Sequence, residues 1–477
     1  MIFGHFYTIV GIIFHEHFVK PLVSAYVIMK LLFIFAAKRE RMKKKVTIIF
    51  MLLILGYLNG QDIVGQWNGT LKVPAQSLRL VLHIHERDSG YAATLVSLDQ
   101  GAAKIPITEI SFENNKLNFS IINVIHYTGI LSNDSIKGLF KQSGATFPLI
   151  LCKDEIIIEK KQRPQEPKKP YSYFEEDVLL DNLNSSGVTL AGTLTLPYQE
   201  GVFPAIILVS GSGAQNRDSE IFGHKPFLVI ADYLTRQGFA VLRYDDRGTA
   251  ASTGIHDTCS TYDFSTDAEA AFLYLQKRKD INPNQIGFIG HSEGGMIATM
   301  VAARNKDISS IILLAAPGIR GDSLLFLQSK IEAKRVYGLN EEEIEKVLNS
   351  RRRQDEIILY SSDNKQMEND LIVFFGELYD SQTFFSGTQG EKVDFVKQSV
   401  RISGSKFYQY FIKYDPASAL ALVKCPVLVL NGENDVQVPA EENLNAIQNI
   451  LLGAGNTDVA IKKLPCIIQS KPTQNTV

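Results

Sequence analysis

The sequence predicts an α/β protein: a doubly wound, mostly parallel sheet with a helical cap insertion, preceded by a small antiparallel all-β domain. Residues 61–158 hold short alternating runs without helical period, whereas residues 173–477 alternate apolar strands with amphipathic helices. The segment between them, residues 159–172, is charged and rich in proline. We interpret it as a linker, because such a composition cannot bury apolar surface.

Composition narrows the class of protein and of partner. The chain has 477 residues, of which 45% are hydrophobic and 21% charged, as in soluble globular proteins with several domains. The formal net charge of -2 and the lack of a basic stripe argue against nucleic acid as a partner. The four cysteines show no C-x-x-C spacing, which argues against a zinc site or a disulfide scaffold. A small neutral molecule is the expected partner, and the oligomeric state is not predicted.

The amino-terminal part predicts export. From Met42 the chain reads MKKKVTIIFMLLILGYLNGQ, and residues 42–60 have the layout of a secretory signal peptide. Upstream, the apolar run 21–37 is interrupted by Lys30 and falls at the short limit for a membrane span. Two interpretations stay open: a membrane anchor, or a translation start placed too early, with residues 1–41 as a doubtful extension. We favour the second and expect a periplasmic or extracellular protein with no stable membrane span in the mature chain.

The front domain is predicted to be an antiparallel barrel or sandwich. In LRLVLHIHE (78–86), leucine and isoleucine recur at every second position, the period of a half-buried strand. His83 and His85 share one face of that strand, as two metal ligands could. Because the sequence places no third ligand with them, we interpret them as part of a polar outer face and expect no metal.

The second domain is predicted from alternating strand and helix patterns. EEDVLLDNL and VTLAGTLTL indicate an antiparallel opening pair. The strands expected to follow are AIILVSG (205–211), AVLRYDD (240–246), IGFIGHS (286–292), SIILLAA (310–316), CPVLVLNG (425–432) and DVAIKKLP (458–465). Most are near-continuous apolar runs, which is typical of parallel strands covered on both faces. Residues 319–420 interrupt the series after the sixth strand, and we expect them to form a cap above the carboxyl ends of the strands, over a substrate pocket.

A serine stands where one predicted strand turns into a helix. Gly290-x-Ser292-x-Gly294 follows IGFI and precedes the helical MIATMVAARN, which is the context of a nucleophile elbow. A turn this tight strains the serine backbone and leaves no room for side chains at the two glycines. Ser292 is therefore the predicted nucleophile. His291 is not its base, because adjacent residues on so sharp a turn point apart.

A glycine loop supplies the expected oxyanion hole. LVSGSGAQNRD (208–218) ends the first parallel strand. We predict that the backbone N–H of Ser212 meets that of Glu293 near a developing alkoxide. A phosphate-binding loop is disfavoured, because neither G-x-G-x-x-G nor G-K-S/T is present.

The acid is expected after the next-to-last strand. VLVLNGENDVQVP places Asp435 there, with Glu433 as the lesser candidate. The chain order serine then aspartate fits a strand-turn-helix nucleophile of this type.

The stretch from about residue 173 resembles the α/β-hydrolase superfamily, in particular exported bacterial esterases related to prolyl-oligopeptidase-like hydrolases and acyl-CoA thioesterases. The motifs that carry the resemblance, in family order, are VSGSGAQNRD, FGHKPF, RYDDRG, GHSEGG and NGENDVQVP. It implies Ser292 as nucleophile and Asp435 as the acid that orients the base. It also implies Ser212 and Glu293 as oxyanion donors, and no cofactor. The turn 244–248 matches a family turn whose charges we expect to be structural.

The third member of a catalytic triad is missing from the printed sequence. The family places its histidine after the last strand and closes the sheet with a helix. Twelve residues follow Pro465, none of them histidine, and the last of the nine histidines is His291. His224 and His256 stand in loops near the rim, where the fold would not deliver a base against Asp435. We expect a frameshifted or truncated tail and impaired hydrolysis.

The function expected from these residues is hydrolysis of short acyl esters through an acyl-enzyme on serine. One alternative is a serine peptidase of the prolyl-oligopeptidase (S9 or S33-like) type, against which the small front domain lacks propeller repeats. The other is a non-catalytic ligand-binding relic, which the missing histidine favours. The identity of the substrate is not predicted.

Overall fold

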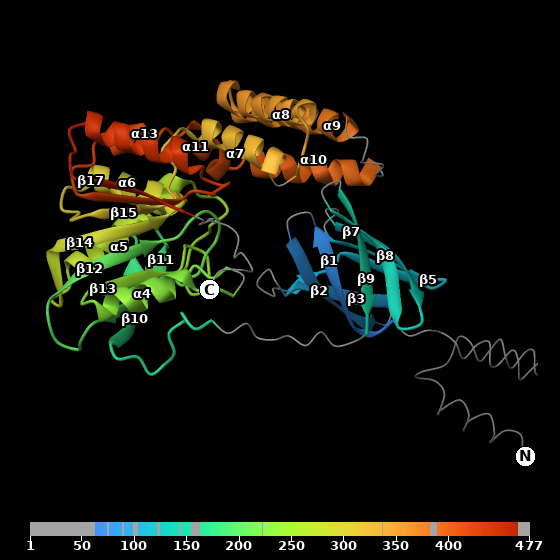
Figure 1. Cartoon of the computed structure of the whole chain (residues 1–477), viewed down its shortest axis with the longest axis horizontal. Helices are drawn as coiled ribbons and strands as arrows, with labels where there is room; N and C mark the ends of the chain where they lie inside the picture. Colours follow the sequence, from blue (N-terminus) through green and yellow to red (C-terminus); the bar gives the residue numbers. More distant parts are fainter. Residues whose placement is uncertain are drawn as a thin grey trace, which may run out of the picture. The chain divides into compact units, whose positions relative to one another are not determined.

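The computed structural model describes most of the chain after residue 62 (Figure 1). The described ranges are 63–73, 76–87, 90–98, 104–121, 125–142, 145–153, 163–221, 223–335, 337–381 and 389–465. The predicted amino-terminal extension, the signal peptide and the tail after Pro465 lie outside them, and the domain boundaries stay predictions. Within the described ranges, no helix combines the length and the hydrophobicity that a membrane crossing requires.

The front domain is one antiparallel sheet of nine strands, in the order β4-β3-β2-β1-β9-β8-β7-β6-β5. The strands are β1 Gly65–Val73, β2 Gln76–Arg87, β3 Gly90–Ser97, β4 Lys104–Pro106, β5 Glu109–Glu113, β6 Lys116–Ile121, β7 Ile125–Ser132, β8 Ser135–Gln142 and β9 Ala145–Cys152. The edge strands β4 and β5 follow one another in the chain, and the N–H of Ile107 between them donates to Ala93 O of β3 at 3.0 Å. The sheet therefore curls into a half-barrel. The antiparallel prediction is confirmed, and of the two forms left open the structure has the curled single sheet.

The alternation expected in β2 is present except at Val81, which is buried like its neighbours. Leu82 and Ile84 are fully buried, His83 is half-buried and His85 is exposed. Among the described residues, no three His, Cys, Asp or Glu side chains are grouped so that they could hold a metal ion.

The second sheet has eight strands in the order β10-β11-β13-β12-β14-β15-β16-β17. Its strands are β10 Phe174–Asp181, β11 Thr189–Leu196, β12 Phe203–Val209, β13 Ala240–Tyr244, β14 Ile281–His291, β15 Ile311–Leu314, β16 Val427–Gly432 and β17 Val459–Leu464. β10 and β11 form the predicted antiparallel pair, and β11 also runs antiparallel to its other neighbour, β13. β12 to β17 are parallel to one another. The predicted fold class is confirmed.

Helices cover both faces of this sheet. They are α4 Pro226–Arg236, α5 Thr261–Gln276, α6 Glu293–Arg304 and α13 Ala440–Gly453. On β12, Ile207 and Val209 pack in a core with α5, α6 and α13. The residues that alternate with them, Ile206 and Leu208, pack in a separate core with α4. In Figure 1, α4 lies beside β13 and α13 lies beside β17. Burial on both faces explains why these strands read as continuous apolar runs.

The predicted cap is inserted between β15 and β16. Its helices are α7 Gly321–Arg335, α8 Glu341–Tyr360, α9 Asn364–Ser381, α10 Gln389–Ser403, α11 Lys406–Lys413 and α12 Ala417–Leu420. The cap has an apolar core of its own, built around Leu371 and Phe374. It is tied to the sheet domain by the ion pair of Lys406 with Asp263 at 2.7 Å.

Candidate active site

Ser292 occupies the sharp turn between β14 and α6. Its backbone has φ 54 and ψ -119, a conformation that residues with side chains rarely adopt. The turn is held by a hydrogen bond from Ser292 N to Leu314 O at 2.8 Å and by one from Gly295 N to Ser292 O at 2.9 Å. A strained residue of this kind costs about 1–3 kcal/mol and persists only where its surroundings impose it, as at functional sites.

The neighbouring glycines are required by close backbone packing. A Cβ at Gly290 would lie 2.1 Å from Gly294 O, and a Cβ at Gly294 would lie 2.2 Å from Val209 O of β12. Sequence analysis missed a third position, Gly295, where a Cβ would lie 2.4 Å from the Cβ of Ala316. Three strand ends therefore meet the elbow with no room for a methyl group.

The loop after β12 lies directly against the elbow. We call residues 210–215 the oxyanion loop. A Cβ at Gly211 would lie 3.2 Å from the Cβ of Ser292. The Ser212 hydroxyl lies near the carboxyl of Glu293, which begins α6. The first N–H groups of a helix have no partner within it. The structure thus brings Ser292, Ser212 and Glu293 together at the N-terminus of α6.

The Glu293 side chain is buried beneath this loop. It is 2% exposed, and burial raises the pKa of its carboxyl, while the hydroxyls of Thr261 and Ser212 oppose the rise. The oxyanion role predicted for Glu293 concerns its backbone N–H, and it stays a prediction.

Asp435 lies in the turn that follows β16. It is 2% exposed, and its Oδ1 accepts hydrogen bonds from Gln437 N at 2.9 Å and Val438 N at 3.0 Å. Burial raises the pKa of Asp435 to about 6, and the two N–H groups limit the rise. Glu433, the lesser candidate, is exposed, and its N–H donates to Leu464 O. Burial and fixed geometry favour Asp435 as the orienting acid.

The strand register sets the spacing between nucleophile and acid. β15 lies between β14 and β16, and His291, Leu314 and Leu430 occupy matching positions on the three strands. Two strand spacings amount to about 10 Å. Ser292 and Asp435 therefore follow strand ends between which an imidazole would have to stand.

The histidines weighed as bases stand at three different places. His291 ends β14, and burial lowers its pKa, which favours the neutral ring. His224 forms an isolated β-bridge with Ile221. The ring of His256 stacks on Phe264 with 4.9 Å between ring centroids. The two loop histidines thus stand before α4 and before α5, on segments remote in sequence from the turn that carries Asp435.

The charges of the turn 244–248 are bound by protein groups. Arg217 donates hydrogen bonds to the Asp245 carboxylate from Nε at 3.1 Å and from Nη2 at 2.8 Å. Arg247 grips Asp267 of α5 through Nε at 2.6 Å and Nη2 at 2.8 Å. These contacts agree with the structural role expected for the turn.

The cap reaches the turn that carries the acid. Gln328 and Glu332 of α7 both hydrogen-bond to the side chain of Gln437, at 2.5 and 2.8 Å. Gln437 in turn donates its N–H to Asp435. Sequence analysis missed Gln437, because a link between segments so distant in the chain leaves no local pattern.

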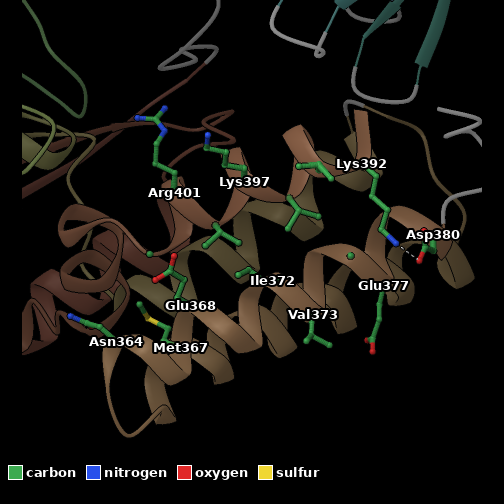
Figure 2. Close-up of a pocket in the computed structure, with 15 residues that line it drawn as sticks. Asn364, Met367, Glu368, Ile372, Val373, Glu377, Asp380, Lys392, Lys397 and Arg401 are labelled. Carbon is green, nitrogen blue, oxygen red and sulfur yellow. Dashed lines mark hydrogen bonds and ion pairs between the residues drawn. The ribbon is translucent and has the colours of Figure 1, made fainter. Parts of the chain in front are cut away.

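A pocket of about 940 Å³ lies between α9 and α10 of the cap (Figure 2). Its wall is apolar at Met367, Ile372 and Val396, and the ion pair of Lys392 with Asp380 at 2.6 Å crosses one end. None of its lining residues belongs to the strand ends or loops that carry Ser292 and Asp435. The predicted substrate pocket beneath the cap is therefore a different place, and it stays a prediction.

Replacing Asp435 by Asn is expected to change how stability depends on pH. In the folded protein the pKa of Asp435 is raised from 3.8 to about 6. The stability contributed by its protonated carboxyl is therefore fully present below pH 3.8 and is lost as pH rises through 6. Asn keeps the Oδ1 acceptor but does not ionise, so the variant does not lose this stability as pH rises. Asp435→Asn should gain up to about 3 kcal/mol over the wild type between pH 4 and 7.5, at about 1.36 kcal/mol per pKa unit.

Equilibrium urea unfolding at both pH values measures this difference. Glu433→Gln, an exchange of the same kind at an exposed side chain of the same turn, is the control and should follow the wild type. If the free energy of unfolding changed equally with pH in Asp435→Asn and in the wild type, the result would contradict a buried carboxyl with a raised pKa at this position.

Comparison with known proteins agrees with the fold. Residues 204–459 match the family model described as alpha/beta hydrolase fold. Esterase EstD of Thermotoga maritima is 32% identical over 165 residues, which are 34% of this chain and 38% of EstD. The chain thus matches less than half the length of that relative.

Two solved structures are similar at low identity. The alpha/beta hydrolase GrgF from Penicillium sp. sh18 is 18% identical with a TM-score of 0.39, over 62% of this chain and 92% of GrgF. The Pyrococcus furiosus esterase Pf2001 is 16% identical with a TM-score of 0.38, over 62% of this chain and 85% of Pf2001. The family model, by contrast, spans more than half of the chain, including the strained serine, the glycine loop and Asp435. The chain belongs to the alpha/beta hydrolase family.

Proposed function

We propose that the protein is a serine hydrolase of carboxylic esters with short acyl groups. Ser292 Oγ attacks the ester carbonyl, and the oxyanion is stabilised by the N–H groups of Ser212 and Glu293. Collapse of this intermediate releases the alcohol and leaves an acyl-serine, which water then cleaves to the acid and free serine. The observation that carries the proposal is the strained Ser292 at the N-terminus of α6, in contact with the oxyanion loop.

The proton of Ser292 needs an acceptor. In the proposed mechanism an imidazole between Ser292 and Asp435 takes it and later returns it to the leaving group, while Asp435 orients the ring. The printed sequence has no histidine after His291. Loss of the triad histidine lowers kcat by about 10⁶-fold in a serine hydrolase and leaves about 10³- to 10⁴-fold catalysis over water. We propose that a polypeptide of these 477 residues turns over slowly unless imidazole is supplied.

The relatives and the amino-terminal segment support the substrate class and the place of action. Esterase EstD, by its name, acts on esters, and it shares 32% identity over the matched part. The signal-like residues 42–60 support export, to the periplasm or the outside of the cell.

Turnover of paired substrates tests the reaction class. With imidazole present, p-nitrophenyl acetate and butyrate are expected to be hydrolysed with a higher kcat/KM than aminoacyl p-nitroanilides, and Ser292→Ala should remove the enzyme-dependent rate for both. A higher kcat/KM for the anilides would instead favour the serine peptidase.

A second candidate, a ligand-binding protein without catalysis, is distinguished from the esterase by chemical labelling. It predicts that a fluorophosphonate leaves Ser292 unmodified in the folded protein even when imidazole is supplied. The esterase predicts modification.

A further inference from the structure

The side chain of Gln215 closes the oxyanion loop from within. Its Nε2 donates to Gly211 O at 3.0 Å and to Ser212 O at 3.2 Å. Its Oε1 accepts from Ser219 Oγ at 2.5 Å. Because the two loop carbonyls can only accept, the amide group that faces them must be the NH₂, and the amide oxygen is left to accept from the Ser219 hydroxyl.

The Gly211 carbonyl and the Ser212 N–H belong to one peptide group. In a trans peptide these two bonds point in opposite directions. Holding Gly211 O toward Gln215 therefore turns the Ser212 N–H away from Gln215. Gly211 itself packs against Ser292, with 3.2 Å from its Cβ position to the serine Cβ. The glutamine amide thus sets the direction in which the expected oxyanion donor points.

Asp246 holds the two ends of the same loop. Its Oδ1 accepts from Ser210 Oγ at 2.8 Å, and its Oδ2 accepts from Gln215 N at 2.8 Å. Its own N–H donates to Gln215 O at 3.0 Å. One carboxylate therefore fixes the first residue of the loop and the backbone of Gln215, and through it the start of the glutamine side chain.

This carboxylate stands in an unfavourable place for a charge. Burial raises the pKa of Asp246 to about 7, although Gln215 N–H and the Ser210 hydroxyl oppose the rise. Glu293 and Asp267 lie near enough to add to it. Asp246 and Glu293 line one small cavity of about 10 Å³ under the loop. A carboxyl with so perturbed a pKa, bound to the loop that packs against Ser292, is more typical of functional sites than of ordinary turns.

We propose that Gln215 is a positioning residue that aims the Ser212 N–H at the oxyanion, and that Asp246 fixes Gln215 in that pose. The inference rests on the proposed function, because it needs an oxyanion at Ser292. A donor that acts on the transition state and not on the ground state lowers kcat when it is misdirected and leaves KM nearly unchanged.

Gln215→Glu tests the proposal with little change in shape. The new carboxylate places an oxygen where Nε2 stood, facing Gly211 O and Ser212 O, which should turn the peptide away. In imidazole-assisted hydrolysis of p-nitrophenyl butyrate, kcat is expected to fall about 10- to 100-fold, below the 10²- to 10³-fold for outright loss of one donor. KM should stay within about threefold, in line with an interaction made only in the transition state.

The matched control is Gln409→Glu in the cap. Gln409 Nε2 also donates to a glycine carbonyl, Gly404 O, at 2.9 Å, and its side chain is likewise half-buried. The same exchange there removes the same kind of bond outside the site, so kcat should remain near that of the wild type. Equal kcat values for the two variants, or a loss confined to KM, would overturn the positioning role.

Hydrogen–deuterium exchange of a peptide covering residues 208–218 provides a readout that needs no turnover. Exchange is expected to become faster in Gln215→Glu. It should also become faster in Asp246→Asn, because the new amide turns an NH₂ group toward a donor of the loop. In Gln409→Glu it should stay unchanged. Asp246→Asn also serves as the second variant if Gln215→Glu does not fold. If amide exchange of residues 208–218 were unchanged in a folded variant, the proposal that Gln215 and Asp246 hold the loop would be overturned. Absence of Ser292-dependent turnover in the wild type would refute the proposed function separately, while the exchange result still decides whether Gln215 and Asp246 hold the loop.

Discussion

Imidazole is expected to raise the rate at which the 477-residue polypeptide hydrolyses p-nitrophenyl acetate, and Ser292→Ala to abolish that increase. Ser292 and Asp435 follow strand ends about 10 Å apart, so an added ring must supply the proton transfer between them. We expect an increase of about 10- to 100-fold, less than the 10²- to 10⁴-fold of a fixed general base, because the added ring is not held in place.

The increase should also depend on pH in a defined direction. Imidazole accepts a proton only when neutral, and an imidazole side chain has an ordinary pKa of about 6.5. The pKa of Asp435 is raised to about 6, so the carboxylate that orients the ring forms over a similar range. The effect of imidazole should therefore grow between pH 5.5 and 8.

Two variants separate this effect from imidazole's own reaction with the ester. Ser292→Ala reports hydrolysis by free imidazole alone, and its rate is subtracted. Asp435→Asn keeps the hydrogen bonds of the turn through Oδ1 but lacks the charge that orients the ring, so it should show a smaller increase. Equal increments in the wild type and in Ser292→Ala would rule out Ser292 as the nucleophile that imidazole assists.

Gly294→Ala is expected to destabilise the fold by about 2–4 kcal/mol, at or above the usual cost of overpacking a core. The added Cβ would lie 2.2 Å from Val209 O and 2.4 Å from Ser210 O, and both are backbone atoms that cannot rotate away. Relief would require β12 or α6 to move. Because Ser210 begins the oxyanion loop, such a shift would also displace that loop from Ser292.

Gly453→Ala is the matched control for this prediction. Gly453 ends α13, and its Cβ position has no neighbour within 4 Å. Alanine there should leave stability unchanged or raise it by up to about 1 kcal/mol, the usual advantage of alanine over glycine in a helix. Urea unfolding measures both variants. If they share one midpoint, the elbow is less tightly packed than the structure shows.

Much of the fold could be predicted because the signals are local. The antiparallel pair β10 and β11, the apolar parallel strands and the inserted cap each follow from residues adjacent in sequence. The alternation of apolar and polar residues could not predict two features. One is that the front sheet curls into a half-barrel, and the other is that β13 lies between β11 and β12. Alternation determines which face of a strand is buried, but neither how a sheet bends nor which strands become neighbours.

The site shows the same division. Gly290, Ser292 and Gly294 could be identified because an elbow needs its glycines at fixed spacing beside the serine. Gln215 was missed, because its contacts with Gly211 exist only once the loop has closed. Asp246 was assigned to a structural turn, since nothing in RYDDRG distinguishes this carboxylate, which holds a neighbouring loop, from Asp245, which pairs with Arg217.

The most direct test of the central claim is mass spectrometry of the folded protein after treatment with a fluorophosphonate in the presence of imidazole. One phosphonyl group per chain is expected, on the peptide that contains Ser292, and no such adduct in Ser292→Ala or in urea-unfolded protein. An unmodified Ser292 in the folded protein, or an adduct on another serine at the same rate, would contradict that claim.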